Sequence, residues 1–161
     1  MSAIQFNKDV DDHQKEINEK GKLHANLISK WIEDNNFSID IVFSSTAKRA
    51  KQTTNIIFEK MKSVVHFKKE LYLCTYIEII EELKAIEKDL VNVLVVGHEP
   101  SMSETLKFLV GDKTRPDLNN KINEPYPTGG LAIINLNIEK WSDIVEKKGI
   151  LDAFLAPEEL I

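Results

Sequence analysis

Arg49 and His98 are the residues of this sequence best placed to do chemistry, because each follows an apolar, strand-like segment. Arg49 comes shortly after the β-branched run at residues 39–43, and His98 follows the apolar run at residues 91–96. In an open α/β sheet, ligands bind beyond the carboxyl ends of the strands, close to the N-termini of the following helices. An arginine, a histidine and free helix N–H groups at one such edge favour a phosphate or phosphoryl group.

The composition strengthens this interpretation of Arg49. The chain contains 19 lysines but only two arginines, Arg49 and Arg115. A guanidinium offers a planar, bidentate fork that an ammonium group cannot provide. Two simpler alternatives stay open, in which Arg49 pairs with a glutamate on a helix surface and His98 bonds to the backbone of its own loop. For Arg115, a solvated surface position is favoured over contact with a substrate.

The other reactive side chains have structural explanations. His13 lies in an acidic segment that could indicate a metal ion, together with Asp9, Asp11 and Asp12. One histidine in an acidic loop provides no defined coordination geometry, so we predict a solvated loop and no metal or other cofactor. His24 and His66 are predicted to be structural, and Cys74 to be an inert core thiol. The hydroxyl residues at positions 44–46 are typical of a helix cap.

Strand-like segments alternate with amphipathic helices along the chain. Helices are expected at residues 18–34, 47–61, 76–88 and 101–110. Asn18 is expected to cap the first of them, and Ser101 with Glu104 to form a capping box at the last. Strands are expected at residues 39–43, 64–67, 91–96 and 131–136, with a loop at 111–127 and a polar tail after 136. The alternation predicts a three-layer α/β/α fold with a mainly parallel sheet.

The composition is that of one globular domain. Apolar residues make up 42% and charged residues 29% of the 161-residue chain, and the net charge is −5. This charge gives no general attraction to nucleic acid or to an anionic membrane, and no apolar run approaches the ~20 residues needed to span a bilayer. A single cysteine excludes an internal disulfide, and the polar first twenty residues contain no secretory signal. We therefore expect one cytoplasmic domain over residues 1–161, with no nucleic-acid or membrane partner.

Four stretches carry motifs in a characteristic order, namely residues 12–21 (DHQKEINEKG), 44–53 (SSTAKRAKQT), 95–100 (VVGHEP) and 127–130 (PTGG). In order and spacing they resemble the histidine phosphatase superfamily, in its small SixA-like branch of phosphohistidine phosphatases. The resemblance extends over almost the whole chain. The second and third motifs together are fairly specific, whereas either one alone is weak.

The resemblance implies a phosphoglycerate-mutase-like fold and a metal-free hydrolysis that proceeds through a phosphohistidine intermediate. The expected partner is a phosphorylated protein that carries phosphohistidine, or a small phosphate ester. Arg49 would clamp the phosphoryl oxygens, and His98 would donate a hydrogen bond to them. Thr128 is placed near the rim of the pocket, although a role at the start of a strand explains it equally well. The general acid stays open among Glu78, Glu81, Glu82 and Glu99.

The sequence departs from the family pattern at the nucleophile. The family places a nucleophilic histidine directly after an arginine, at the end of a first, central strand, and this sequence contains no Arg-His pair. Counted back from Gly21, that histidine would fall immediately before Met1. We therefore expect an N-terminally incomplete domain that lacks the first central strand. Such a chain would be inactive or impaired, and poorly stable unless another segment takes the place of the strand.

Two rival functions follow from the missing nucleophile. The chain is either a phosphatase domain whose first strand is absent, or a non-catalytic module that binds phosphate or a phosphoprotein through Arg49 and His98. A third possibility is a structural domain in which these two side chains never meet. The distance between them in the folded chain therefore separates the third possibility from the first two.

Overall fold

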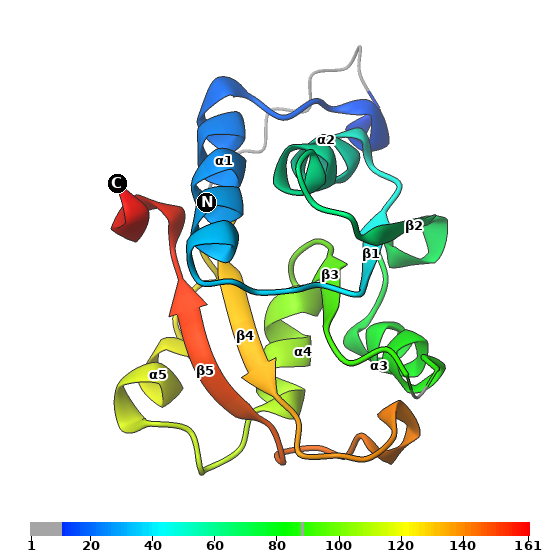
Figure 1. Cartoon of the computed structure of the whole chain (residues 1–161), viewed down its shortest axis with the longest axis vertical. Helices are drawn as coiled ribbons and strands as arrows, with labels where there is room; N and C mark the ends of the chain where they lie inside the picture. The colour runs from blue at the N-terminus through cyan, green and yellow to red at the C-terminus, as the bar shows by residue number, and fades with distance from the viewer. Residues whose placement is uncertain (1–10, 88) are drawn as a thin grey trace.

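Helices and strands alternate along the chain in a computed structural model that describes residues 11–87 and 89–161 (Figure 1). The α-helices are α1 (Glu19–Asp34), α2 (Lys48–Phe58), α3 (Tyr76–Lys84), α4 (Ser101–Leu109) and α5 (Pro116–Lys121). The strands are β1 (Ile41–Ser45), β2 (Val64–Lys68), β3 (Val93–Val96), β4 (Leu131–Asn135) and β5 (Ile150–Leu155). Short 3-10 helices are η1 (Asp12–Gln14), η2 (Lys69–Leu71), η3 (Trp141–Asp143) and η4 (Pro157–Leu160). None of the helices described is long and apolar enough to cross a membrane.

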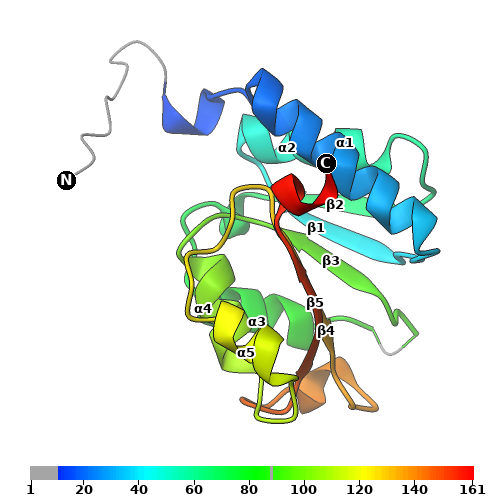
Figure 2. The same cartoon turned by 90° about the vertical axis from the view of Figure 1, so that its left-hand side faces the viewer.

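The strands form two sheets. β1 lies between β2 and β3 in a parallel sheet, in which Ser44 pairs with Phe67 on one side and with Val96 on the other. β4 and β5 form a separate antiparallel pair. Figure 2 shows α1 and α2 on one side of the parallel sheet and α3 and α4 on the other. The expected α/β/α arrangement with parallel strands is confirmed.

β1 contributes to the core on both sides of the sheet because its side chains alternate between the two faces. Val42 packs in the cluster that contains Ile28 of α1 and Ile57 of α2. Phe43 packs in the cluster that contains Ile79 of α3. All the residues of β1 are buried, as expected for a central parallel strand that helices cover on both faces.

Two segments contain secondary structure that the sequence did not predict. The stretch at residues 111–127, expected to be a loop, contains α5, and the expected polar tail contains β5. Leu118 of α5 packs in one buried cluster with Leu151 and Phe154 of β5. Both segments are therefore stabilised by contacts between parts of the chain that lie far apart in sequence, which include Leu106 of α4 and the pairing of β5 with β4.

The N-terminal caps are partly as expected. Asn18 caps α1, since its side-chain oxygen accepts a hydrogen bond from the Gly21 N–H at 2.8 Å. The capping box expected at Ser101 is wrong, because Pro100 occupies the N-cap and makes no side-chain bond there. Ser101 Oγ instead donates to the carbonyl oxygen of His98 at 2.7 Å. This bond fixes the turn that carries His98 to the start of α4.

Candidate phosphoryl-binding site

The pairing of β1 with β3 brings Arg49 and His98 together. Arg49 lies in the first turn of α2, shortly after β1, and His98 lies two residues after the end of β3. Because the two strands are parallel neighbours, their carboxyl ends meet at one edge of the sheet. Arg49 Nη2 lies 3.4 Å from His98 Nδ1. The two side chains therefore meet, which excludes the possibility that they lie apart.

His98 is oriented through both of its ring nitrogens. Nε2 lies 2.7 Å from Ser45 Oγ, and Ser45 Oγ also accepts the backbone N–H of Ala47. An arginine can only donate, so the contact with Arg49 assigns Nδ1 as the acceptor and places the ring proton on Nε2. Burial and the neighbouring guanidinium both lower the pKa of His98 below its ordinary value. The ring is held by a side chain and not, as the simpler alternative had it, by its own loop.

Arg49 is fixed by Asp12 and not by a glutamate. Nη1 donates to the Asp12 carbonyl oxygen at 2.8 Å, and Nη2 lies 3.3 Å from Asp12 Oδ2. About a third of the Arg49 side chain is exposed, at 33%. The contacts of Nη2 with Asp12 and His98 are long, so an incoming anion can compete for this nitrogen. Asp12 thus orients the Arg49 side chain, while Nη2 stays able to bind an anion.

Tyr72 and His13 complete the surroundings, and neither was singled out from the sequence as part of the site. The Tyr72 hydroxyl donates to Asp12 Oδ2 at 2.6 Å. This bond, with a further contribution from Arg49, lowers the pKa of Asp12, and the carboxylate in turn raises the pKa of Tyr72. The Tyr72 ring also makes edge contacts with the rings of His13 and His98. The motif at residues 12–21, which contains both Asp12 and His13, was the feature of the sequence that could have indicated this part of the site.

His13 is part of this cluster and does not lie in a free acidic loop. Its Nε2 lies 2.9 Å from Thr46 Oγ1, so that the start of the chain described is tied to the segment between β1 and α2. Asp9 lies outside the described residues. Within residues 11–87 and 89–161, no group of three or more His, Cys, Asp or Glu side chains is placed to hold a metal ion.

The positions of the four candidate general acids in the fold distinguish them from one another. Glu78 closes the capping box of α3 with Thr75, and Glu82 pairs with Lys68. Glu99 lines the same cavity as Arg49 and His98, as does Thr128, whereas Glu78, Glu81 and Glu82 are not among its lining residues. Glu99 also accepts the Ser103 N–H at 3.0 Å. Of the four glutamates, Glu99 is therefore the one that shares the pocket.

The remaining candidates lie away from the site or pack in the core. Arg115 is exposed and pairs with Asp117 at 2.9 Å. His24 is buried in α1, and its Nε2 lies 3.6 Å from Glu158. His66 is exposed on β2, where its ring lies near that of Phe43. Burial raises the pKa of the Cys74 thiol, which fits an unreactive cysteine.

Sequence comparison identifies the family. The model of the histidine phosphatase superfamily (branch 1) matches residues 4–73. An uncharacterized protein of Mycobacterium leprae (strain TN), ML1117, is 30% identical over 152 residues, which cover 94% of this chain and 92% of that protein. The chain belongs to the histidine phosphatase superfamily. The uncharacterized protein Rv1276c of Mycobacterium tuberculosis is 28% identical over 149 residues, or 92% of each chain.

Solved structures agree with this membership of the histidine phosphatase superfamily. A protein assigned as the phosphohistidine phosphatase SixA of Nakamurella multipartitia is 27% identical, with a TM-score of 0.76 over 92% of this chain and 88% of that one. Its counterpart from Agrobacterium tumefaciens is 26% identical, with a TM-score of 0.77 and the same coverage. A SixA structure in complex with tungstate is 20% identical and shares the fold, with a TM-score of 0.75 over 94% and 90%. The fold expected from the motifs is thereby confirmed.

Proposed function

We propose that this chain binds the phosphoryl group of a phosphohistidine or phosphomonoester between Arg49 and His98, as part of a phosphatase site. The approach of Arg49 Nη2 to His98 Nδ1, at 3.4 Å beyond the carboxyl ends of two paired strands, is the observation that carries the proposal. The family and the SixA neighbours support the reaction class. Phosphohistidine on a protein is the favoured substrate, because the SixA neighbours are assigned that activity.

The contacts around the two side chains define how each would act. Arg49 would turn Nη2 from its long contact with Asp12 toward a phosphoryl oxygen, while Nη1 stays on the Asp12 carbonyl. A dianion beside Nδ1 of His98 favours protonation of the ring. The imidazolium would then donate from Nδ1 to the same phosphoryl group and from Nε2 to Ser45. Binding of the anion is thus coupled to proton uptake by His98.

Hydrolysis also requires a nucleophile that attacks phosphorus. The family resemblance assigns this step to a histidine that directly follows an arginine. The four histidines of the chain follow Asp12, Leu23, Val65 and Gly97. This observation supports a second candidate function, a module that binds a phosphorylated ligand without turning it over.

Two measurements separate these functions. Tungstate binding, followed by the rise in melting temperature, tests the phosphoryl site, because a ligand that binds the native state stabilises it by mass action. Release of phosphate from a phosphohistidine protein and from p-nitrophenyl phosphate tests turnover. Turnover that His98→Ala abolishes supports the phosphatase, and tungstate binding without turnover supports the binding module. A chain that tungstate does not stabilise would overturn both.

Arg49→Lys is the sharpest variant for the phosphoryl site. Lysine keeps the positive charge but loses the fork, so we expect tungstate to bind about ten- to a hundredfold more weakly. Arg115→Lys is the matched control, since Arg115 is exposed and pairs with Asp117 outside the site. Equal effects of the two substitutions on tungstate affinity would contradict the assignment of Arg49.

A further inference from the structure

Asp12 presents a negative charge to the same guanidinium nitrogen of Arg49 that would bind a phosphoryl oxygen. Nη1 of Arg49 donates to the backbone carbonyl oxygen of Asp12 at 2.8 Å, whereas Nη2 lies 3.3 Å from the carboxylate oxygen Oδ2. Within the described part of the chain, no other carboxylate forms an ion pair with Arg49. The backbone of Asp12 can therefore hold the guanidinium without the carboxylate, whose charge acts mainly on whatever else binds Nη2.

Two further side chains keep the Asp12 carboxylate ionised and in place. The Tyr72 hydroxyl donates to Oδ2 at 2.6 Å, and Lys15 Nζ lies 3.7 Å from Oδ1. The bond from Tyr72 is the largest cause of the lowered pKa of Asp12. When Nη2 of Arg49 turns toward an anion, Oδ2 keeps its bond to Tyr72. The carboxylate thus remains beside the bound anion as a negative charge.

The separation of these two charges is short enough to affect binding. A phosphoryl oxygen bonded to Nη2 of Arg49 lies about 2.8 Å from that nitrogen. Because Oδ2 of Asp12 is 3.3 Å from the same nitrogen, the two oxygens are at most about 6 Å apart. The Asp12 side chain is 41% exposed, so solvent partly screens the repulsion. Between the limits for water and for a protein surface, a repulsion at this distance weakens binding by about tenfold.

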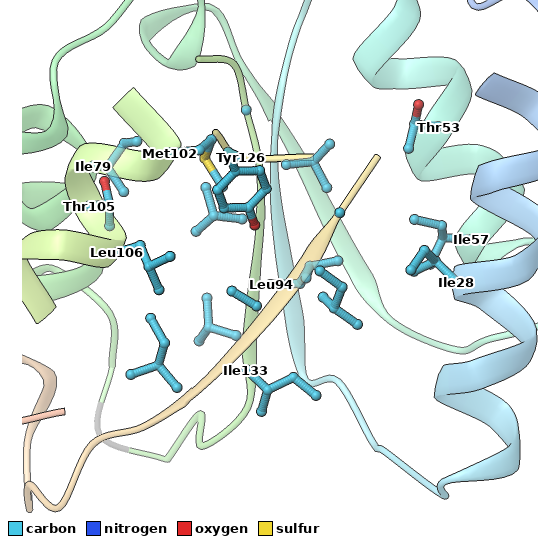
Figure 3. Close-up of a pocket in the computed structure, with 18 of the residues that line it drawn as sticks. Ile28, Thr53, Ile57, Ile79, Leu94, Met102, Thr105, Leu106, Tyr126 and Ile133 are labelled. Atoms are coloured by element: carbon cyan, nitrogen blue, oxygen red, sulfur yellow. The ribbon is translucent and has the colours of Figure 1, made fainter. Parts of the chain in front are cut away.

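The cavity that Arg49 and His98 line does not offset this repulsion. It lies between β3 and β4, has a volume of about 1020 Å³, and is walled largely by apolar side chains such as Leu94 and Met102 (Figure 3). These walls offer no charge to an anion at Arg49. Asp12 is not among the residues that line the cavity, so its carboxylate acts from another side of the guanidinium.

We infer that Asp12 determines which phosphoryl compounds this site retains. Its carboxylate competes with the ligand for Nη2 of Arg49 and repels a second negative charge on the ligand. A phosphoryl group attached to a protonated nitrogen brings a compensating positive charge, so it binds better than free phosphate or the dianion of a phosphomonoester. This inference rests on the proposed phosphoryl site and adds the side chain that selects among its ligands.

Tungstate and perrhenate test the charge selectivity, because both are tetrahedral oxyanions but carry two and one negative charges. Asp12→Asn removes the charge, while it keeps the backbone carbonyl for Arg49 and an oxygen for the Tyr72 hydroxyl. We expect the variant to bind tungstate about tenfold and perrhenate about threefold more tightly than the native chain does. A carboxylate that only positioned Arg49 would give the opposite sign. Isothermal titration calorimetry of the whole chain in the cold measures both affinities.

Asp11→Asn is the matched control, because it makes the same change of charge one residue away. The Asp11 side chain accepts the His13 N–H at 3.4 Å as the N-cap of η1, and asparagine serves equally well as an N-cap. Asp11 makes no ion pair with Arg49, so solvent should screen its charge and tungstate affinity should change less than about twofold.

Inorganic phosphate and phosphoramidate, whose nitrogen is protonated at neutral pH, test the class of ligand. We expect the native chain to bind phosphoramidate more tightly than phosphate. This preference should fall about threefold in Asp12→Asn, because the two ligands differ by one charge, and should persist in Asp11→Asn.

The outcomes separate this inference from the proposed function. Tungstate affinity that is equal or weaker in Asp12→Asn would overturn the role of Asp12 and leave the phosphoryl site in place. A chain that binds tungstate in neither form would overturn both. If Asp12→Asn fails to fold, the native chain still decides, since phosphoramidate binding that is no tighter than phosphate binding would overturn the inference.

Discussion

At the scale of single residues, the candidate site is a chain of contacts that starts from Tyr72. Its hydroxyl bonds Asp12, Asp12 holds Arg49, and Arg49 approaches His98, which Ser45 holds from the other side. The two side chains proposed to bind the anion are thus placed by groups that would not themselves contact a phosphoryl oxygen. Tyr72 acts in this arrangement as a positioning residue.

Removal of the Tyr72 hydroxyl should raise the pKa of Asp12. The bond from Tyr72 is the largest cause of the lowered pKa, so Tyr72→Phe moves the carboxyl toward its ordinary value. A lowered carboxyl pKa contributes stability at higher pH that is lost as the pH falls through the folded-state pKa. The variant should therefore lose less stability on acidification. Carboxyl NMR titration measures the pKa, and an unchanged value for Asp12 would contradict the assigned bond.

Tyr76→Phe is the control for that substitution. The Tyr76 ring packs near Phe108, and the substitution removes a hydroxyl from another partly buried tyrosine while the ring stays in place. We expect no change in the pKa of Asp12. Because Asp12 and Arg49 are partly exposed, the loss of stability in Tyr72→Phe should stay below about 1.5 kcal/mol.

His98 should titrate below its ordinary range in the native chain. Burial is the larger cause and Arg49 the second, so Arg49→Met should raise the pKa of His98 without fully restoring it. Because the unfolded ring takes up a proton more readily than the folded one, His98 should reduce stability as the pH falls below about 6.5. Imidazole NMR signals followed against pH measure both forms. A native pKa at or above the ordinary value would contradict the assigned surroundings.

At the scale of elements, the site depends on how β1, β3 and α1 are held. β1 and β3 fix the spacing of Arg49 and His98, and α1 covers one face of the sheet with Ala25, Ile28 and Ile32. The entry to α1 is fixed by Asn18, which follows the segment that carries Asp12 and His13. A weakened N-terminus of α1 therefore affects both the core and the site.

Asn18→Ala should lower the free energy of unfolding by about 1 kcal/mol, since it removes the bond to the Gly21 N–H. Asn26→Ala, in the middle of the same helix, is the matched control. Its side chain is exposed and bonds only the helix backbone, so alanine should be neutral or slightly stabilising there. Urea denaturation of both variants provides the comparison. Similar losses at the two positions would show that the cap does not stabilise α1.

At the scale of the whole molecule, helices and loops join the two sheets, and no backbone pairing between the sheets is found within residues 11–87 and 89–161. The strand order ends at β3 in one sheet and begins at β4 in the other. An apolar cavity of this size reduces the contacts that its lining side chains make. Globular domains retain only about 5–15 kcal/mol of net stability, so such losses are large in comparison.

We accordingly expect the 161-residue chain to be poorly stable alone. Differential scanning calorimetry should show a weak or poorly cooperative transition near room temperature. A cooperative melt of the monomer well above room temperature would contradict this expectation.

The sequence by itself determined the class of fold and indicated the two principal candidate site residues. Apolar strands followed by helices predict parallel pairing, and parallel pairing brings the residues after β1 and β3 to one edge. Arg49 and His98 could therefore be named before any coordinates, because their positions depend on local patterns. The elements α5 and β5 could not, since Leu118, Leu151 and Phe154 are buried in a cluster that forms between segments far apart in sequence and includes Leu106 of α4.

Only the tertiary structure decided which side chains contact the candidate site residues and how β3 and β4 lie around the cavity. Asp12 and Tyr72 are 60 positions apart in sequence, and their 2.6 Å bond follows from the folded path of the chain. The same holds for the contact of His13 with Thr46. The cavity between β3 and β4 is likewise a product of how whole elements pack. The period of apolar residues along the sequence indicates helices and strands. Contacts between side chains that lie far apart in sequence form only once the chain has folded.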